Sequence, residues 1–151
     1  MSAHRATVRW QPTDAPFTYA TYSRTHRWHF EGGTEVDASA APAYRGDPAL
    51  VDPEEAFVAS LASCHLLTFL ALAARDGLVV TGYEDEAEGV LAKNADGRLA
   101  VTRVVLRPRV TFGGAAPSAE VMAEMHERAH AACFIANSVR TEVVVEPVAV
   151  R

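Results

Sequence analysis

The chain has 151 residues, of which 49% are hydrophobic and 22% charged, a composition typical of one globular domain with a sizeable core. Its formal net charge of -5 and isoelectric point near 5.6 give no basic surface for phosphate contacts, so we expect no nucleic-acid partner. The first residues lack the apolar segment of a secretory signal, and two cysteines are too few for a disulfide scaffold. We therefore expect a single domain over residues 1–151 in the cytoplasm, where thiols stay reduced unless they have a redox role.

The first 51 residues carry strand patterns followed by a loop. Ala6–Trp10 alternates apolar and polar side chains, and residues 17–30 are rich in Thr, Tyr, Trp and Phe, which favours strands. A Glu-Gly-Gly turn precedes a short third strand at residues 34–37. Residues 38–51 contain two prolines and a glycine and are expected to form a loop.

The longest apolar run, from Pro53 to Asp76, predicts a long helix. Asp52 is a suitable N-cap, Pro53 fits the first helical position, and acidic residues follow in the first turn. About 20 apolar residues can span a bilayer. Polar side chains from Ser60 to Thr68 lie in the middle of this run, so we expect a core helix and no membrane partner.

The second half of the chain predicts a hairpin, a second helix and a last strand. Residues 78–91 and 99–112 are strand-like and flank a polar turn that ends in Asp-Gly. Ser118 is a suitable N-cap for a helix that runs to about Ala132, and residues 138–150 favour a strand. This order of elements indicates an α+β domain with antiparallel sheet.

Both cysteines lie in the predicted helices, Cys64 in the middle of the first and Cys133 at the end of the second. A lone buried cysteine is usually a small hydrophobic residue. Two cysteines, each in a major helix beside histidine or small residues, are a first hint of thiol chemistry.

The segment DPEEAFVASLASC, followed 69 positions later by a second cysteine and then by a closing strand, resembles the OsmC/Ohr family, the osmotically inducible protein C and organic hydroperoxide resistance proteins. In that family a Pro-Glu pair stands ten residues before the first cysteine, as Pro53-Glu54 stands before Cys64. The resemblance covers most of the chain. It implies an OsmC-like fold in which antiparallel sheets pack around a long central Cys-bearing helix, in an intertwined homodimer with sites at the subunit interface.

The resemblance also implies a thiol peroxidase that reduces organic hydroperoxides without a cofactor. Cys64 would attack the peroxide and become a sulfenic acid, and Cys133 would resolve it as a disulfide. A dithiol reductant would reopen the disulfide, and in the Ohr branch this reductant is a dihydrolipoyl group.

Attack on the O–O bond requires a thiolate, and a free cysteine is only a few per cent ionised at neutral pH. Families of this type use an arginine held by a carboxylate, because guanidinium keeps its charge and forms several hydrogen bonds. The match indicates Glu54 as the carboxylate. Arg45 resembles the arginine of the OsmC branch and Arg24 that of the Ohr branch, and we expect both near the site. Glu54 and Cys64 would lie about 15 Å apart along one helix, so either the helix is broken or Glu54 completes the site of a second subunit.

One departure from the family pattern is His65, which follows the first cysteine where an aromatic residue is common. It would act as a base or satisfy a hydrogen bond in the core. Apolar residues near the motifs would line a substrate pocket or belong to the core, namely Phe57, Leu61, Leu67, Phe112 and Phe134.

Two other function classes stay open. His126, His130 and Cys133 fall on one helical face, where imidazole and thiolate suit zinc, and the Cys64-His65 pair would approach from the other helix. Alternatively, the protein is a non-catalytic dimeric binding domain in which neither cysteine takes part.

Overall fold

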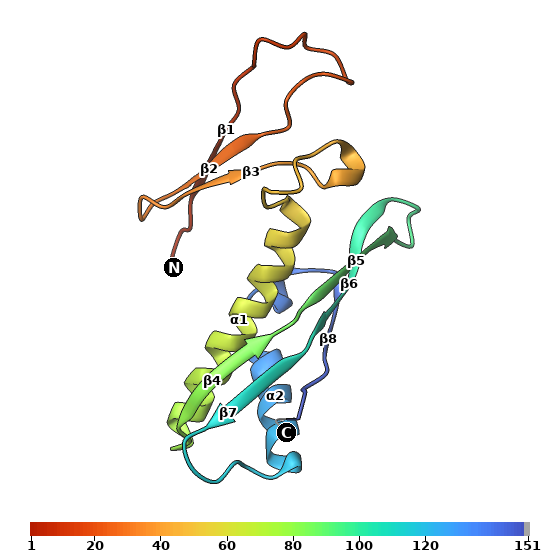
Figure 1. Cartoon of the computed structure of the whole chain (residues 1–151). Coiled ribbons are helices and arrows are strands. Elements are labelled where there is room, and N and C mark those ends of the chain that lie inside the picture. Colours follow the sequence, from red (N-terminus) through yellow and green to blue (C-terminus); the bar gives the residue numbers. More distant parts are fainter. Residues whose placement is uncertain (150–151) are drawn as a thin grey trace. The chain divides into compact units, whose positions relative to one another are not determined.

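A computed structural model describes residues 1–149, and the chain divides into two compact units, Met1–Ala56 and Phe57–Arg151. Figure 1 labels the strands and the two α-helices, which are β1 (Ala6–Arg9), β2 (His26–Phe30), β3 (Glu35–Ala38), α1 (Pro53–Arg75), β4 (Val80–Asp85), β5 (Glu88–Lys93), β6 (Leu99–Leu106), β7 (Pro108–Phe112), α2 (Ala119–Ala132) and β8 (Glu142–Val145). Two short 3-10 helices are η1 (Pro42–Tyr44) and η2 (Ala136–Ser138). These elements confirm the α+β class. The single domain expected over residues 1–151 stays a prediction, and Val150 of the expected last strand lies outside the described residues.

The N-terminal unit is built on a three-stranded antiparallel sheet with the order β1-β2-β3. Gly33, at φ 84°, forms the turn between β2 and β3. The prediction that strand structure begins near residue 17 is wrong, because residues 17–25 form an irregular loop. There the Thr18 and Thr21 hydroxyls bond each other at 2.7 Å, and the Tyr22 amide donates to the Thr18 carbonyl. Such local bonds compete with strand pairing.

Helix α1 begins and ends with well-formed caps. The Asp52 amide donates to a Glu55 carboxylate oxygen at 3.1 Å, and the Glu55 amide donates to Asp52 at 2.8 Å, which is a reciprocal capping box. At the other end, Gly77 adopts φ 74° and the amides of Gly77 and Leu78 donate to the last turn of α1. The helix is continuous from Pro53 to Arg75, which excludes the alternative of a break between Glu54 and Cys64.

In the C-terminal unit, each of the two expected strands is divided in two. β5 pairs with β6 as a hairpin, and β4 pairs with β7, both antiparallel. At the division, the Arg107 amide donates to Asp85 Oδ1 at 2.6 Å instead of continuing the ladder. β8 joins the edge of β6 as a parallel strand, which the expected antiparallel pattern did not include.

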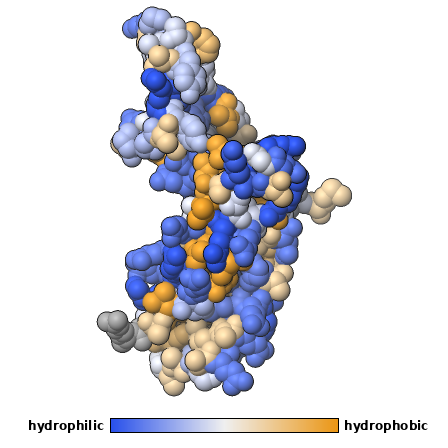
Figure 2. Space-filling view, turned by 90° about the vertical axis from the view of Figure 1, so that its right-hand side faces the viewer, coloured by the Kyte–Doolittle hydropathy of each residue, from blue (hydrophilic) through white to orange (hydrophobic). Residues whose placement is uncertain are grey.

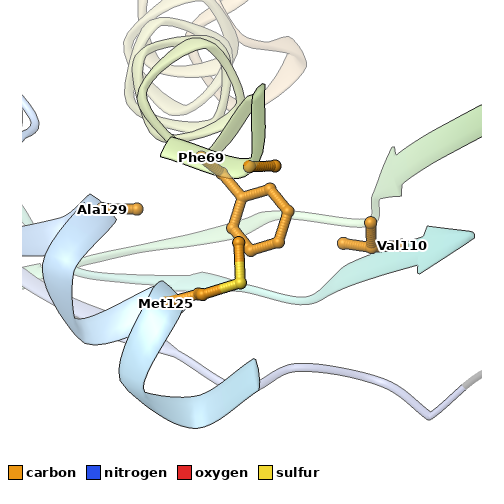
Figure 3. Close-up of a cluster of buried hydrophobic side chains, with 5 residues drawn as sticks. Phe69, Val110, Met125 and Ala129 are labelled. Carbon is orange, nitrogen blue, oxygen red and sulfur yellow. The ribbon is translucent and has the colours of Figure 1, made fainter. Parts of the chain in front are cut away.

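The core of the C-terminal unit consists of two apolar clusters. Phe69 of α1 packs among Val110, Met125 and Ala129 in the first cluster (Figure 3). The second joins Leu61 of α1 to β6. Only 22% of the most apolar window of α1 is buried, and by length and composition alone this helix would also be able to cross a bilayer. Apolar surface therefore stays exposed in the single chain, and Figure 2 shows such surface in orange between hydrophilic regions.

Candidate active site at the paired cysteines

Helices α1 and α2 bring the two cysteines together within the C-terminal unit. Cys64 lies in the middle of α1 and is half-buried, whereas Cys133 is the C-cap of α2 and only 1% exposed. Both are free thiols, and their side chains are within hydrogen-bonding reach of each other. Residues separated by 69 positions in the sequence thus form one thiol pair.

Backbone amides after α2 point at both sulfur atoms. The chain turns at Cys133 and enters η2, where the Ile135 amide donates to Cys64 Sγ at 3.5 Å and the Ala136 amide donates to Cys133 Sγ at 3.4 Å. Hydrogen bonds to sulfur favour its anionic form. The sequence reasoning missed these donors, because every residue except proline has a backbone N–H and the residue type carries no signal for it.

The environment of Cys133 differs from that of Cys64. Burial, followed by the hydrogen bond with Cys64, raises the pKa of Cys133 to about 11. Cys133 therefore stays a protonated thiol at neutral pH, inside the protein. Cys64 is the more exposed residue of the two.

Of the five apolar residues named for a substrate pocket or the core, three belong to the core and two lie at the surface. Leu61 is fully buried, and Phe57 and Phe112 pack against the apolar clusters. Leu67, one turn after Cys64, is 62% exposed, and Phe134, next to Cys133, is 81% exposed. Only the last two remain available to line a surface near the thiols.

His65 belongs to the core and not to the thiol surface. It is fully buried, and its Nε2 atom lies 3.0 Å from Nδ1 of His126, with the two rings stacked. The interpretation as a hydrogen-bonded core histidine is confirmed. His126 is thereby engaged, and within residues 1–149 no group of three or more Cys, His, Asp or Glu side chains is arranged to hold a metal. The alternative of a zinc site at His126, His130 and Cys133 therefore has no support among the described residues.

In the N-terminal unit, the two candidate arginines lie beside the same aromatic ring. Arg24 donates to the carbonyl groups of Tyr19 and Tyr22, and its guanidinium carbon lies 3.7 Å from the Tyr22 ring centroid. The guanidinium carbon of Arg24 lies 5.4 Å from the Tyr19 ring centroid, and that of Arg45 lies 5.8 Å from it. Cations favour the faces of such rings. The sequence reasoning named both arginines but missed the tyrosines, which it assigned to a strand.

Glu54 lies in the first turn of α1, beside the Asp52–Glu55 capping box. Among the described residues it forms no ion pair with Arg24 or Arg45. Arg24 is instead held by carbonyl groups and tyrosine rings. The pairing of Glu54 with Arg24 or Arg45 stays a prediction for the homodimer.

Comparison with known proteins places these features in a family. A family model described as OsmC-like protein matches residues 46–148. An OsmC-like protein of unknown function from Vibrio cholerae is 49% identical, with a TM-score of 0.94, and the alignment covers 98% of this chain and 100% of that one. No curated protein matches the chain.

More distant solved structures share the fold. An organic hydroperoxide resistance protein OsmC from Legionella pneumophila, 16% identical, has a TM-score of 0.74 over 100% of this chain and 98% of that one. The organic hydroperoxide resistance protein OhrB of Bacillus subtilis, 19% identical, has a TM-score of 0.69 over 99% of this chain and 98% of that one. The OsmC-like fold predicted from the sequence is confirmed.

Proposed function

Because the chain belongs to the OsmC-like protein family, we propose that it is a thiol-dependent peroxidase that reduces organic hydroperoxides. The observation that carries the proposal is the pair of free thiols, one half-buried and one buried, in hydrogen-bonding reach of each other. A second support is that two distant relatives of this fold are named organic hydroperoxide resistance proteins.

The reaction proceeds in three balanced steps. The Cys64 thiolate attacks the distal peroxide oxygen, the O–O bond breaks, and the alkoxide leaves and takes up a proton to become the alcohol. The resulting Cys64 sulfenic acid condenses with the Cys133 thiol, which forms the S–S bond and releases water. An external dithiol, such as a dihydrolipoyl group, then reduces the disulfide to two thiols and is itself oxidised. No cofactor takes part.

Arg24 or Arg45, held by Glu54, completes the site by stabilising the thiolate and the developing alkoxide. Glu54 and Cys64 stand ten residues apart on a continuous helix, so two chains build each site in a homodimer. The exposed apolar surface of α1 supports this assembly, because a stable partner would bury it. The reducing environment that the cycle needs is that of the cytoplasm.

The test is hydroperoxide consumption with a dithiol reductant, for the parent protein and for C64S and C133S. C64S should reduce consumption to the rate of buffer, because the nucleophile is gone. C133S should form the Cys64 sulfenic acid but no intramolecular disulfide, because the resolving thiol is gone. Full activity of C64S would show the peroxidase proposal to be wrong and would favour the non-catalytic dimeric domain.

A further inference from the structure

Two buried histidines join the helices that carry the cysteines. His65 follows Cys64 on α1, and His126 lies two turns before Cys133 on α2. His65 is fully buried and His126 is 3% exposed. Their ring nitrogens are 3.0 Å apart, their ring centroids 5.3 Å apart, and the His126 ring also stacks on Phe69. This contact is a buried polar link between the two helices, and the Arg128–Asp76 ion pair, 3.0 Å long, joins α2 to the end of α1 nearer the surface.

The hydrogen bonds of this histidine pair leave no acceptor for an added proton. The single bond joins His65 Nε2 to His126 Nδ1, so one ring donates and the other accepts. The other two ring nitrogens, His65 Nδ1 and His126 Nε2, are buried without a partner in the described part of the chain. In either tautomer, an added proton would sit on one of these nitrogens with no acceptor, which carries the cost of an unsatisfied and charged buried group.

The surrounding charges do not compensate for such a proton. On α1 no residue from 56 to 74 carries a formal charge. On α2 the neighbours are His130, which opposes a positive charge on His65, and Glu127, which is exposed. On β4, the Tyr83 ring centroid lies 5.9 Å from that of Phe69, and the Tyr83 hydroxyl is buried without a partner among the described residues. Burial and then the Asp85 charge raise the pKa of this hydroxyl.

A surface pocket lies next to His126. This pocket, of about 250 Å³, is lined by Ala123, His126, Glu127, His130, Val145 and Pro147. The pocket therefore brings solvent close to His126, whose Nε2 atom is itself buried. Burial lowers the pKa of both His65 and His126 to about 4, so both rings are neutral at pH 7.

We propose that the His65–His126 pair is an acid-sensitive joint between the two cysteine-bearing helices. Protonation of either ring opens the joint, α1 and α2 separate locally, and the buried Cys133 moves away from Cys64 into contact with solvent. Acid thereby uncouples the thiol pair while the two sheets of the unit persist. The inference does not depend on peroxidase activity, because it concerns only the accessibility of Cys133.

The experiment measures the labelling of Cys133 in the C64S variant, in which it is the single thiol. A pyridyl disulfide serves as the reagent, and each rate is divided by that of a small reference thiol at the same pH. Between pH 7.5 and pH 4.5 the relative rate should rise about tenfold or more, because the open state gains population. A C64S/H65F/H126F variant keeps the aromatic stack but has no proton to gain, so its relative rate should stay constant. C64S/H4Q, which removes an exposed histidine, should behave like C64S.

Two results would overturn the joint: a relative rate that stays constant in C64S, or an equal rise in C64S/H65F/H126F. If that triple variant does not fold, ring NMR signals of His65 and His126 in C64S decide the question. The proposal requires these signals to titrate with the same midpoint as the labelling. A rise in labelling without a change in the two rings would contradict it.

Discussion

The amide of Ile135 donates to Cys64 Sγ at 3.5 Å, which ties the turn after α2 to the middle of α1. The neighbouring Ala136 amide donates to Cys133 Sγ, so two consecutive amides hold the two sulfur atoms. In this arrangement the thiol pair depends on the path of the backbone and not on any charged side chain of the C-terminal unit.

Removal of the Ile135 amide should slow the oxidation of Cys64. Ile135 has φ -70°, which proline can adopt, so I135P deletes the donor with little change at that residue. A hydrogen bond to a charged group contributes about 1.5 kcal/mol or more, so we expect about a tenfold lower rate constant with an organic hydroperoxide. I135V, which keeps the amide, is the control, and stopped-flow thiol oxidation is the measurement. Equal rates for I135P and I135V would remove this amide from the mechanism.

One of the two arginines beside Tyr19 should matter for the rate of attack. The R24Q/R45Q double variant should lose about a hundredfold in the rate constant for hydroperoxide, because the proposed site would then lack the cation that stabilises the thiolate. The two single variants then identify the residue that acts. R98Q, in the exposed turn before β6, changes the net charge as much as each single variant does and should leave the rate unchanged. A double variant as fast as R98Q would exclude both arginines from the reaction.

Stability should depend on pH through the buried histidines. Their pKa values fall from 6.5 to about 4 on folding, so the unfolded state binds more protons between these pH values. The free energy of unfolding is therefore highest above about pH 6.5 and decreases as the pH falls toward 4, by up to about 3 kcal/mol per ring. Urea unfolding at several pH values measures this slope. H65F/H126F should flatten it, and an unchanged slope would assign the effect to other groups.

A charge on the exposed apolar face of α1 should prevent dimer formation. Leu67 is 62% exposed in the single chain, and glutamate there would be costly to bury at an interface. In sedimentation experiments the parent should have twice the 16.3 kDa mass of one chain, whereas L67E should be monomeric. Leu99, 60% exposed at the start of β6, provides the control L99E. A dimeric L67E would place the interface elsewhere.

The local signals in the sequence were sufficient to predict the two helices. Asp52 and Pro53 mark the start of α1, Gly77 its end, and Ser118 the start of α2, because caps depend on the residue type at one position. The spacing of Pro53-Glu54 and Cys64 identified the family, and with it the fold.

Features that depend on tertiary contacts were missed. The parallel pairing of β8 with β6 follows from how the chain returns to the sheet, not from its composition. The Ile135 and Ala136 donors are backbone groups and carry no residue signal. The partner of His65 lies 61 positions away, and nothing in the sequence distinguishes His126 as that partner from His130.

The most direct test of the peroxidase is a thiol count before and after one equivalent of an organic hydroperoxide, with the dithiol absent. Two thiols per chain should be lost together, and mass spectrometry should find an intramolecular disulfide between Cys64 and Cys133. A parallel sample with hydrogen peroxide measures the preference for organic substrates. Retention of both thiols under these conditions would contradict the proposed function.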